Sequence, residues 1–130
     1  MLPYEPVEGQ LIALQHRLLR ASRAMLDPML NLGLTDVATA ERVLAEEARF
    51  SPSMVKQEVD RYTFRAPGQA GSYFYGYSQL IDLRTETELA LGDKFDRMAF
   101  NDFIVGQGLL PIGLLSQAVR EDFIPAQRAR

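Results

Sequence analysis

The residues best suited to chemistry gather in the middle of the chain, between Arg61 and Arg84. Three tyrosines fall within five residues there, and two of them, Tyr73 and Tyr77, are four residues apart. If this segment is helical, Gln69 shares their face, because side chains four residues apart lie above one another on an α-helix. A phenol and an amide directed into a cleft can donate hydrogen bonds to a carbonyl or a developing oxyanion. Packing of the tyrosines in an aromatic core is the alternative that this pattern leaves open.

A second group of candidate residues lies near the start of the chain. Arg20, Arg23 and Asp27 are spaced three and four residues apart, which places them on one side of a helix. The planar fork of an arginine matches a substrate carboxylate or sulfate. An intrahelical ion pair with Asp27 is the structural alternative.

The sequence lacks the residues of several other kinds of catalytic site. It has no cysteine and a single histidine, His16, which sits in the middle of the first predicted helix. A zinc site normally needs three protein ligands, and the helical HExxH arrangement needs two histidines. No serine lies in a G-x-S-x-G context, and no glycine-rich loop follows a strand. We therefore expect no metal or other cofactor in this chain, and no complete zinc-peptidase site.

Composition narrows the class of protein and its partners. The chain has 130 residues, of which 47% are hydrophobic, enough for one ordinary domain with a core. Its net charge of −3 gives no sign of a nucleic-acid partner. No apolar run approaches the roughly 18 residues of a membrane span, and the first residues do not resemble a secretory signal. These features predict a cytoplasmic protein that binds neither nucleic acid nor membrane.

Helical periodicity runs through the sequence, and no segment alternates long enough to predict a strand. We expect an all-α fold, a single domain over residues 1–130, with an N-terminal extension at 1–8 and a frayed tail at 125–130. Capping and breaking residues predict six helices, at about 9–30, 36–48, 51–66, 69–91, 96–105 and 111–123. Pro28 should kink the first helix or end it near Asp27.

The first predicted helix carries apolar residues on more than half of its circumference, which predicts extensive burial. Its two stripes are Leu11, Leu14, Leu18, Ala21, Met25 and Met29, and Ile12, Leu19 and Leu26. Inward faces of the next two helices are predicted at Val37, Ala40, Leu44 and Ala48, and at Val55, Val59 and Tyr62. Gly76 weakens the fourth helix, which predicts that another group approaches its backbone closely there.

Several short motifs occur in a fixed order between Leu11 and Val119. They read RASRAMLD at 20–27, EVDRY at 58–62, PGQAGSY at 67–73, LGDKFD at 91–96 and GLLPIGLL at 108–115. On these motifs the sequence resembles the C-terminal portion of the bacterial domain-of-unknown-function family 885. Members of that family are longer and are regarded as zinc metallopeptidases distantly similar to thimet oligopeptidase and carboxypeptidases.

The resemblance implies roles for particular residues. Tyr73 would lie on a helix facing the zinc cleft and polarise the substrate carbonyl, with Gln69 beside it. The paired arginines of the family fall on Arg20 and Arg23. The HExxH helix of the family precedes the region that matches. The family usually has histidine at two positions held here by Asn31 and Asn101, and glycine at the position of Met29.

Three functions follow as hypotheses. The first is a small subunit of a split metallopeptidase-like enzyme, which completes the substrate cleft of a larger partner chain that carries any zinc. In that enzyme Tyr73 would be catalytic, and Gln69, Tyr77, Arg20 and Arg23 would bind substrate. Because the family histidines are replaced, its reaction could have changed from peptide hydrolysis to cyclisation or elimination on a small anionic, amine-bearing molecule in specialised metabolism. The alternatives are a C-terminal fragment of a zinc metallopeptidase and a non-catalytic helical interaction module.

Overall fold

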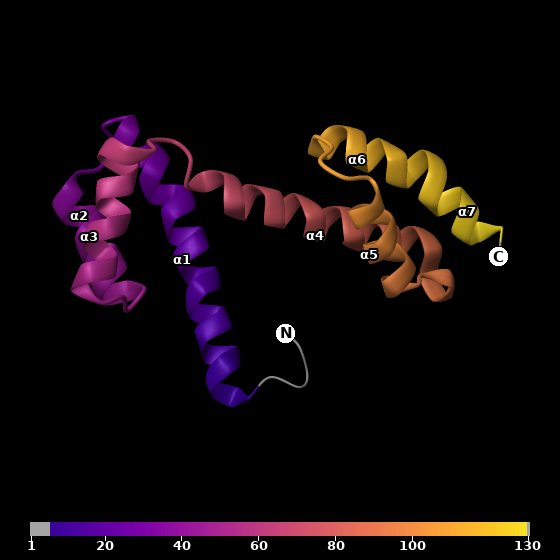
Figure 1. Cartoon of the computed structure of the whole chain (residues 1–130), viewed down its shortest axis with the longest axis horizontal. Helices are drawn as coiled ribbons and strands as arrows, with labels where there is room; N and C mark the ends of the chain where they lie inside the picture. The colour runs from indigo at the N-terminus through magenta and orange to yellow at the C-terminus, as the bar shows by residue number, and fades with distance from the viewer. Residues whose placement is uncertain (1–5, 130) are drawn as a thin grey trace. The chain divides into compact units, whose positions relative to one another are not determined.

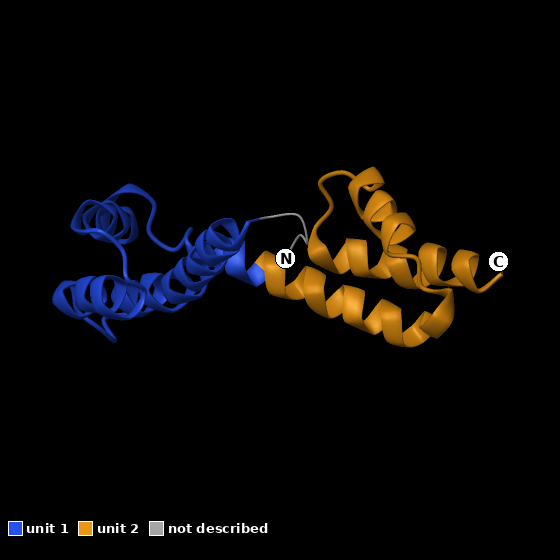
Figure 2. Ribbon diagram, turned by 90° about the horizontal axis from the view of Figure 1, so that it is seen from below, with its two compact units in different colours: residues 1–75 blue, residues 76–130 orange. Residues whose placement is uncertain are grey.

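The computed structural model describes residues 6–129, and these residues form helices and connecting turns with no strand. The predicted all-α fold class is confirmed. The chain divides into two compact units, residues 1–75 and residues 76–130, which are coloured separately in Figure 2. Each unit has its own hydrophobic core. No helix within 6–129 is long and apolar enough to cross a membrane.

The first unit is built mainly from three helices, which Figure 1 shows at the indigo and magenta end of the chain. They are α1 (Val7–Asn31), α2 (Val37–Arg42), which continues in the π-helical turn η1 (Val43–Glu47), and α3 (Pro52–Asp60), which continues in the π-helical turn η2 (Arg61–Arg65). The predicted starts at Asp36 and Ser51 are confirmed. Asp36 accepts a hydrogen bond from the Thr39 amide at 2.7 Å, and Ser51 accepts one from the Met54 amide at 3.4 Å. Both are side-chain caps of exposed helix amides.

The core of the first unit lies where α1, α2 and α3 meet. It contains Leu19, Leu26, Ala40, Leu44, Val55, Val59, Tyr62 and Ala70. The predicted inward faces of the second and third helices are therefore confirmed, except that Val37 is 44% exposed.

Helix α1 passes through Pro28 and ends at Asn31, next to the predicted end at residue 30, so Pro28 does not end the helix at Asp27. The Leu32 amide donates to the Pro28 carbonyl at 2.9 Å, and the Leu34 amide donates to the Met29 carbonyl at 2.8 Å. Gly33, at a φ of 69°, then ends the helix.

The first apolar stripe of α1 is not buried, contrary to the prediction. Leu11, Leu14, Leu18 and Met25 are 63%, 46%, 47% and 50% exposed. The neighbouring helices cover the other side of α1, where Leu19, Arg23, Leu26 and Asp27 are buried. Periodicity found the apolar stripe correctly, but the elements of the first unit pack elsewhere on the helix.

The second unit begins within α4 (Gly71–Leu91), which starts in the first unit. It continues with η3 (Gly92–Lys94), α5 (Arg97–Gly106), α6 (Ile112–Ala118), the π-helical turn η4 (Val119–Phe123) and α7 (Ile124–Arg128). Its core consists of Leu83, Leu91, Phe100, Leu115, Val119 and Phe123. The predicted cap at Asp96 is confirmed, since this side chain accepts from the Met98 and Ala99 amides at 2.8 and 3.1 Å.

The C-terminal residues are helical, where a frayed tail had been predicted. Gln127 is buried, and the Arg128 guanidinium donates to the Ala90 carbonyl at 3.1 Å. The Lys94 ammonium donates to the Arg128 carbonyl at 2.6 Å. These long-range contacts attach the chain end to the second unit. At the other end, the predicted extension is shorter than expected because α1 begins at Val7, and residues 1–5 lie outside the described part.

Gly76 does not meet the predicted close neighbour. A methyl group in place of its hydrogen would meet no described atom within 4 Å, apart from those of its own helix turn. The glycine therefore has no packing role within the described chain.

Candidate functional site

Tyr73, in the first turn of α4, lies beside two guanidinium groups. Arg23 from α1 lies over its ring at 4.5 Å from the ring centroid, and Arg61 from η2 lies at 5.7 Å. The tyrosine is 47% exposed, whereas Arg23 is only 7% exposed. Cation–π attraction to the two arginines stabilises this position of the ring, and about half of the residue stays exposed. We call Tyr73, Arg23, Arg61 and Gln69 the arginine–tyrosine cluster.

Gln69 joins this cluster through Arg61. Its side-chain oxygen accepts a hydrogen bond from the Arg61 guanidinium. The residue is exposed and lies two positions before α4 begins. The structure therefore brings together Tyr73, Gln69 and Arg23 from the predicted site, all within the first unit. It adds Arg61, which the sequence analysis did not select.

Arg23 forms an ion pair with a buried carboxylate, that of Glu58. Its guanidinium lies 3.7 Å from the Glu58 carboxylate, and both side chains are less than a tenth exposed. The same carboxylate accepts a hydrogen bond from the Tyr62 hydroxyl at 2.7 Å. The ion pair of Arg23 is thus with Glu58 on α3, and not with Asp27 on its own helix. The Arg23 Nε is buried and has no hydrogen-bond partner among the described residues.

Asp27 instead fixes the loop that leads into α4. Its side chain is fully buried, and its two oxygens accept from the Gly68 amide and the Ala70 amide, each at 2.7 Å. Asn31 donates to the same carboxylate at 2.9 Å. Gly68 has a φ of 77°, a conformation that glycine adopts readily. Asp27 therefore sets where α4 starts and, with it, the position of Tyr73.

Asn31 connects this carboxylate to the end of α3. Its amide nitrogen also donates to the Asp27 carbonyl at 2.8 Å and to the Tyr62 carbonyl at 3.2 Å. The Asn31 amide therefore has a structural role in this chain.

The remaining two predicted substrate-binding residues are Arg20 and Tyr77. The Arg20 guanidinium donates to the His16 carbonyl at 3.0 Å, along its own helix, and the side chain is exposed. Tyr77 belongs to the second unit and is 40% exposed. Their roles in substrate binding stay predictions.

The described residues contain no group of three or more His, Cys, Asp or Glu side chains that could hold a metal ion. His16 is exposed, and its ring meets the Phe50 ring edge-on at 6.5 Å between centroids.

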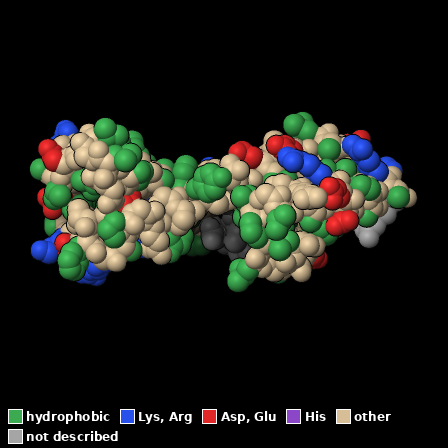
Figure 3. Space-filling model, turned by 90° about the horizontal axis from the view of Figure 1, so that it is seen from above, with side chains coloured by type: hydrophobic (Ala, Val, Ile, Leu, Met, Phe, Trp, Pro, Cys, Tyr) green, Lys and Arg blue, Asp and Glu red, His purple; other side chains and the backbone are tan. Residues whose placement is uncertain are grey.

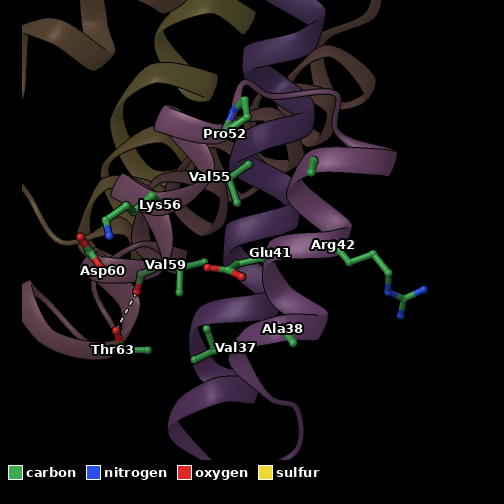
Figure 4. Close-up of a pocket in the computed structure, with 11 residues that line it drawn as sticks. Val37, Ala38, Glu41, Arg42, Pro52, Val55, Lys56, Val59, Asp60 and Thr63 are labelled. Atoms are coloured by element: carbon green, nitrogen blue, oxygen red, sulfur yellow. Dashed lines mark hydrogen bonds between the residues drawn. The ribbon is translucent and has the colours of Figure 1, made fainter.

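A groove of about 560 Å³ opens elsewhere on the first unit, between α2 and α3. Figure 4 shows Lys56 and Asp60 from α3 on one side, with Glu41 from α2 facing them. None of the predicted site residues lines it. Opposite charges alternate along its walls, so it has no single preferred ligand charge.

Tyr62 gives a test of the buried part of the site. Burial, and then the hydrogen bond to Glu58, raise the pKa of the Tyr62 hydroxyl above the ordinary tyrosine value of 10.0. Because the pKa of Tyr62 is higher in the folded state, its protonated hydroxyl stabilises the fold at any pH below the unfolded pKa. This stabilisation is lost as the pH rises from the unfolded pKa toward the folded pKa. We expect urea unfolding to show a loss of stability between about pH 9 and about pH 11 that is smaller in Tyr62→Phe. An equal loss in both proteins would contradict the role of this hydroxyl.

The structure is thus an all-helical protein with a clamped arginine–tyrosine cluster, and its sequence identifies the family. The family model described as "Bacterial protein of unknown function (DUF885)" matches residues 3–119. The chain therefore belongs to this family, as the resemblance predicted. No curated protein and no solved structure matches the chain.

Proposed function

We propose that this chain is a small subunit of a metallopeptidase-like enzyme and supplies one wall of the substrate cleft to a larger partner chain. The observation that carries the proposal is the arginine–tyrosine cluster. Tyr73 is half exposed, and its ring is held by Arg23 and Arg61 at the end of a loop clamped by Asp27.

The chemistry of the cluster suits an anionic substrate with a carbonyl group. A guanidinium binds a carboxylate or sulfate through paired hydrogen bonds. The Tyr73 hydroxyl can donate to the carbonyl oxygen and stabilise the charge that develops there, a contribution of the kind made by an oxyanion hole. The contact with Arg23, at 4.5 Å, already orders the ring before a substrate binds.

The partner would carry the metal and the general base in this proposal. The resemblance implies an HExxH helix upstream of the region that matches here. Both peptide hydrolysis and a cyclisation or elimination on a small amine-bearing molecule could use a phenol in the role of Tyr73. The replacement of family histidines by Asn31 and Asn101 favours a changed reaction.

Purification of the tagged chain from its native host, followed by intact mass and metal analysis, tests the proposal. We expect a stoichiometric larger protein with an HExxH helix or a recognisable remnant of it, and an activity that requires both chains. Bound zinc with peptidase activity would select hydrolysis and exclude the cyclase version. A lone folded monomer, with no activity gained on adding any candidate partner, would contradict the split enzyme.

Arg20→Ala gives a second test, within the reconstituted enzyme. Because Arg20 is exposed and bonded only to its own helix in the described contacts, its loss should leave folding unchanged. We expect KM for an anionic substrate to rise roughly tenfold or more, with a smaller change in kcat. Arg23→Ala should raise KM as well, and should also lower stability, since Glu58 then loses its cation. Exposed Arg42 serves as control, and a rise in KM in Arg42→Ala equal to that in Arg20→Ala would contradict a specific role.

A non-catalytic interaction module is the second candidate. It is favoured by the large apolar side chains exposed on both units, which Figure 3 shows in green. Where such side chains form a contiguous patch, they often mark a protein-binding site. Tyr73→Phe would then leave every measured property of the complex unchanged.

A further inference from the structure

The two guanidinium groups of the arginine–tyrosine cluster are not equivalent. Arg23 is only 7% exposed, and the buried Glu58 carboxylate at 3.7 Å balances its charge. The same guanidinium lies over the Tyr73 ring, 4.5 Å from the centroid. An arginine enclosed by a carboxylate and an aromatic ring presents little of its charge and few of its N–H groups to a ligand. Arg23 therefore holds the ring in place and is poorly placed to bind a ligand directly.

Arg61, at the start of η2, has a charge that no acidic side chain balances. Its guanidinium donates to the Gln69 side-chain oxygen, which is a neutral acceptor in an exposed position, and lies 5.7 Å from the Tyr73 ring centroid. Within residues 6–129, no carboxylate forms an ion pair with it. Arginine has several N–H donors in a planar fork, so the bond to Gln69 leaves donors that can bind an anion.

The other acidic side chains of this region have partners of their own. Asp60, which precedes Arg61 in the sequence, pairs with Arg65 at 3.8 Å. Asp27 on α1 is fully buried, and its oxygens accept hydrogen bonds from backbone amides of the loop before α4. Arg61 is thus the cation of the cluster that stays available to an anion from outside the chain.

The position of Arg61 beside Tyr73 indicates the kind of ligand that reaches both. Because the guanidinium and the ring are neighbours, a short molecule can place an anion on Arg61 and a carbonyl oxygen at the Tyr73 hydroxyl. A carboxylate separated from a carbonyl group by a few bonds meets this requirement. Guanidinium groups bind carboxylates through two parallel hydrogen bonds, which also orients the rest of the molecule.

We propose that Arg61 selects the substrate of this site by binding a carboxylate that lies a few bonds from the carbonyl held by Tyr73. The reaction at that carbonyl rests on the proposed function. Arg61 takes the anion, Gln69 positions the Arg61 guanidinium, and Arg23 positions the ring. Specificity therefore depends on a residue of η2, and the order of the ring depends on α1 and α3.

Two matched probes test this assignment on the full chain. N-acetylglycine has a carboxylate a few bonds from its carbonyl, and N-acetylglycinamide has the same carbonyl without the charge. In NMR titrations of the isotope-labelled chain, we expect N-acetylglycine to bind at least about tenfold more tightly than the amide, the difference that a charge-assisted pair of hydrogen bonds makes. The Arg61 side-chain resonance and the Tyr73 backbone resonance should shift together.

Arg61→Gln should abolish the preference for the charged probe, because glutamine keeps a polar side chain without the charge. Arg61→Lys keeps the charge without the planar fork and should retain part of the preference. Arg65→Gln is the matched control, since Arg65 is an exposed arginine of the same turn η2 and should be dispensable for binding. All three variants should melt close to the unaltered chain.

Several outcomes would overturn the assignment. They are equal affinity for the two probes, no binding of either, and an equal loss of preference in Arg61→Gln and Arg65→Gln. Sodium acetate that binds as tightly as N-acetylglycine would overturn it as well, because the carbonyl would then play no part.

The proposed function fails separately. If a larger subunit and an activity are found but Arg61→Gln leaves KM unchanged, Arg61 does not select the substrate and the split enzyme stands. If N-acetylglycine binds through Arg61 as expected and no partner or activity is found, the cluster is a ligand-binding site and the enzymatic proposal is wrong.

Discussion

Tyr73→Phe is expected to lower the turnover of the assembled enzyme by roughly 10- to 1000-fold, the range seen when one oxyanion-stabilising donor is removed. The free energy of unfolding should hardly change. Phenylalanine keeps the ring that Arg23 and Arg61 contact at 4.5 and 5.7 Å, so the packing of the cluster survives. Only the hydroxyl is lost.

Steady-state kinetics and urea unfolding of the same preparations distinguish a catalytic role of the Tyr73 hydroxyl from a packing role of its ring. Tyr75→Phe is the control, since Tyr75 is 61% exposed and points away from Tyr73 around α4. Its turnover should match that of the unaltered enzyme. Full activity in Tyr73→Phe together with a much lower melting temperature would make Tyr73 a packing residue and refute the site.

Asp27→Asn is expected to cause the largest loss of stability, on the order of 2 to 4 kcal/mol. The two carboxylate oxygens of Asp27 accept backbone amides, from Gly68 and from Ala70, in a fully buried position. An asparagine must turn its own NH2 group toward one of these donors. One of the two backbone N–H groups then has no acceptor and lies against the NH2 group of the asparagine.

Urea unfolding measures this loss directly. Ser51→Ala is the comparison, because it removes an exposed helix cap in the same unit and should cost about 1 kcal/mol or less. Because Asp27 positions the loop before α4, surviving Asp27→Asn protein should also bind substrate less tightly. A change no larger than that of Ser51→Ala would show that the loop does not depend on this carboxylate.

Local signals predicted most of the fold. Asp36, Ser51 and Asp96 were recognised as caps because a cap depends only on a side chain and the amides two or three residues later. Gly92 and the break at Pro67-Gly68 were found for the same reason. Family membership also followed from short motifs whose order is visible in the sequence.

Local signals in the sequence could not predict contacts between residues far apart in the chain. For Asp27 the sequence offered only an ion pair with an arginine on its own helix, as the structural alternative, yet its partners are amides 41 and 43 residues away. Leu11 and Leu18 were placed in the core because periodicity identifies an apolar stripe without showing what covers it. Arg61 was missed as a neighbour of Tyr73, since the two residues lie on different elements and helical periodicity does not show how the loop between them folds.

The hydrogen bonds from the Gly68 and Ala70 amides to the Asp27 carboxylate have a spectroscopic consequence. The proton of an amide whose nitrogen lies 2.7 Å from a carboxylate oxygen is strongly deshielded, so both resonances should appear downfield of the crowded region of a helical protein's NMR spectrum. They should also exchange slowly with deuterium, although they lie in a loop between helices. These two resonances would then show whether a ligand or a partner disturbs the loop before α4, which positions Tyr73.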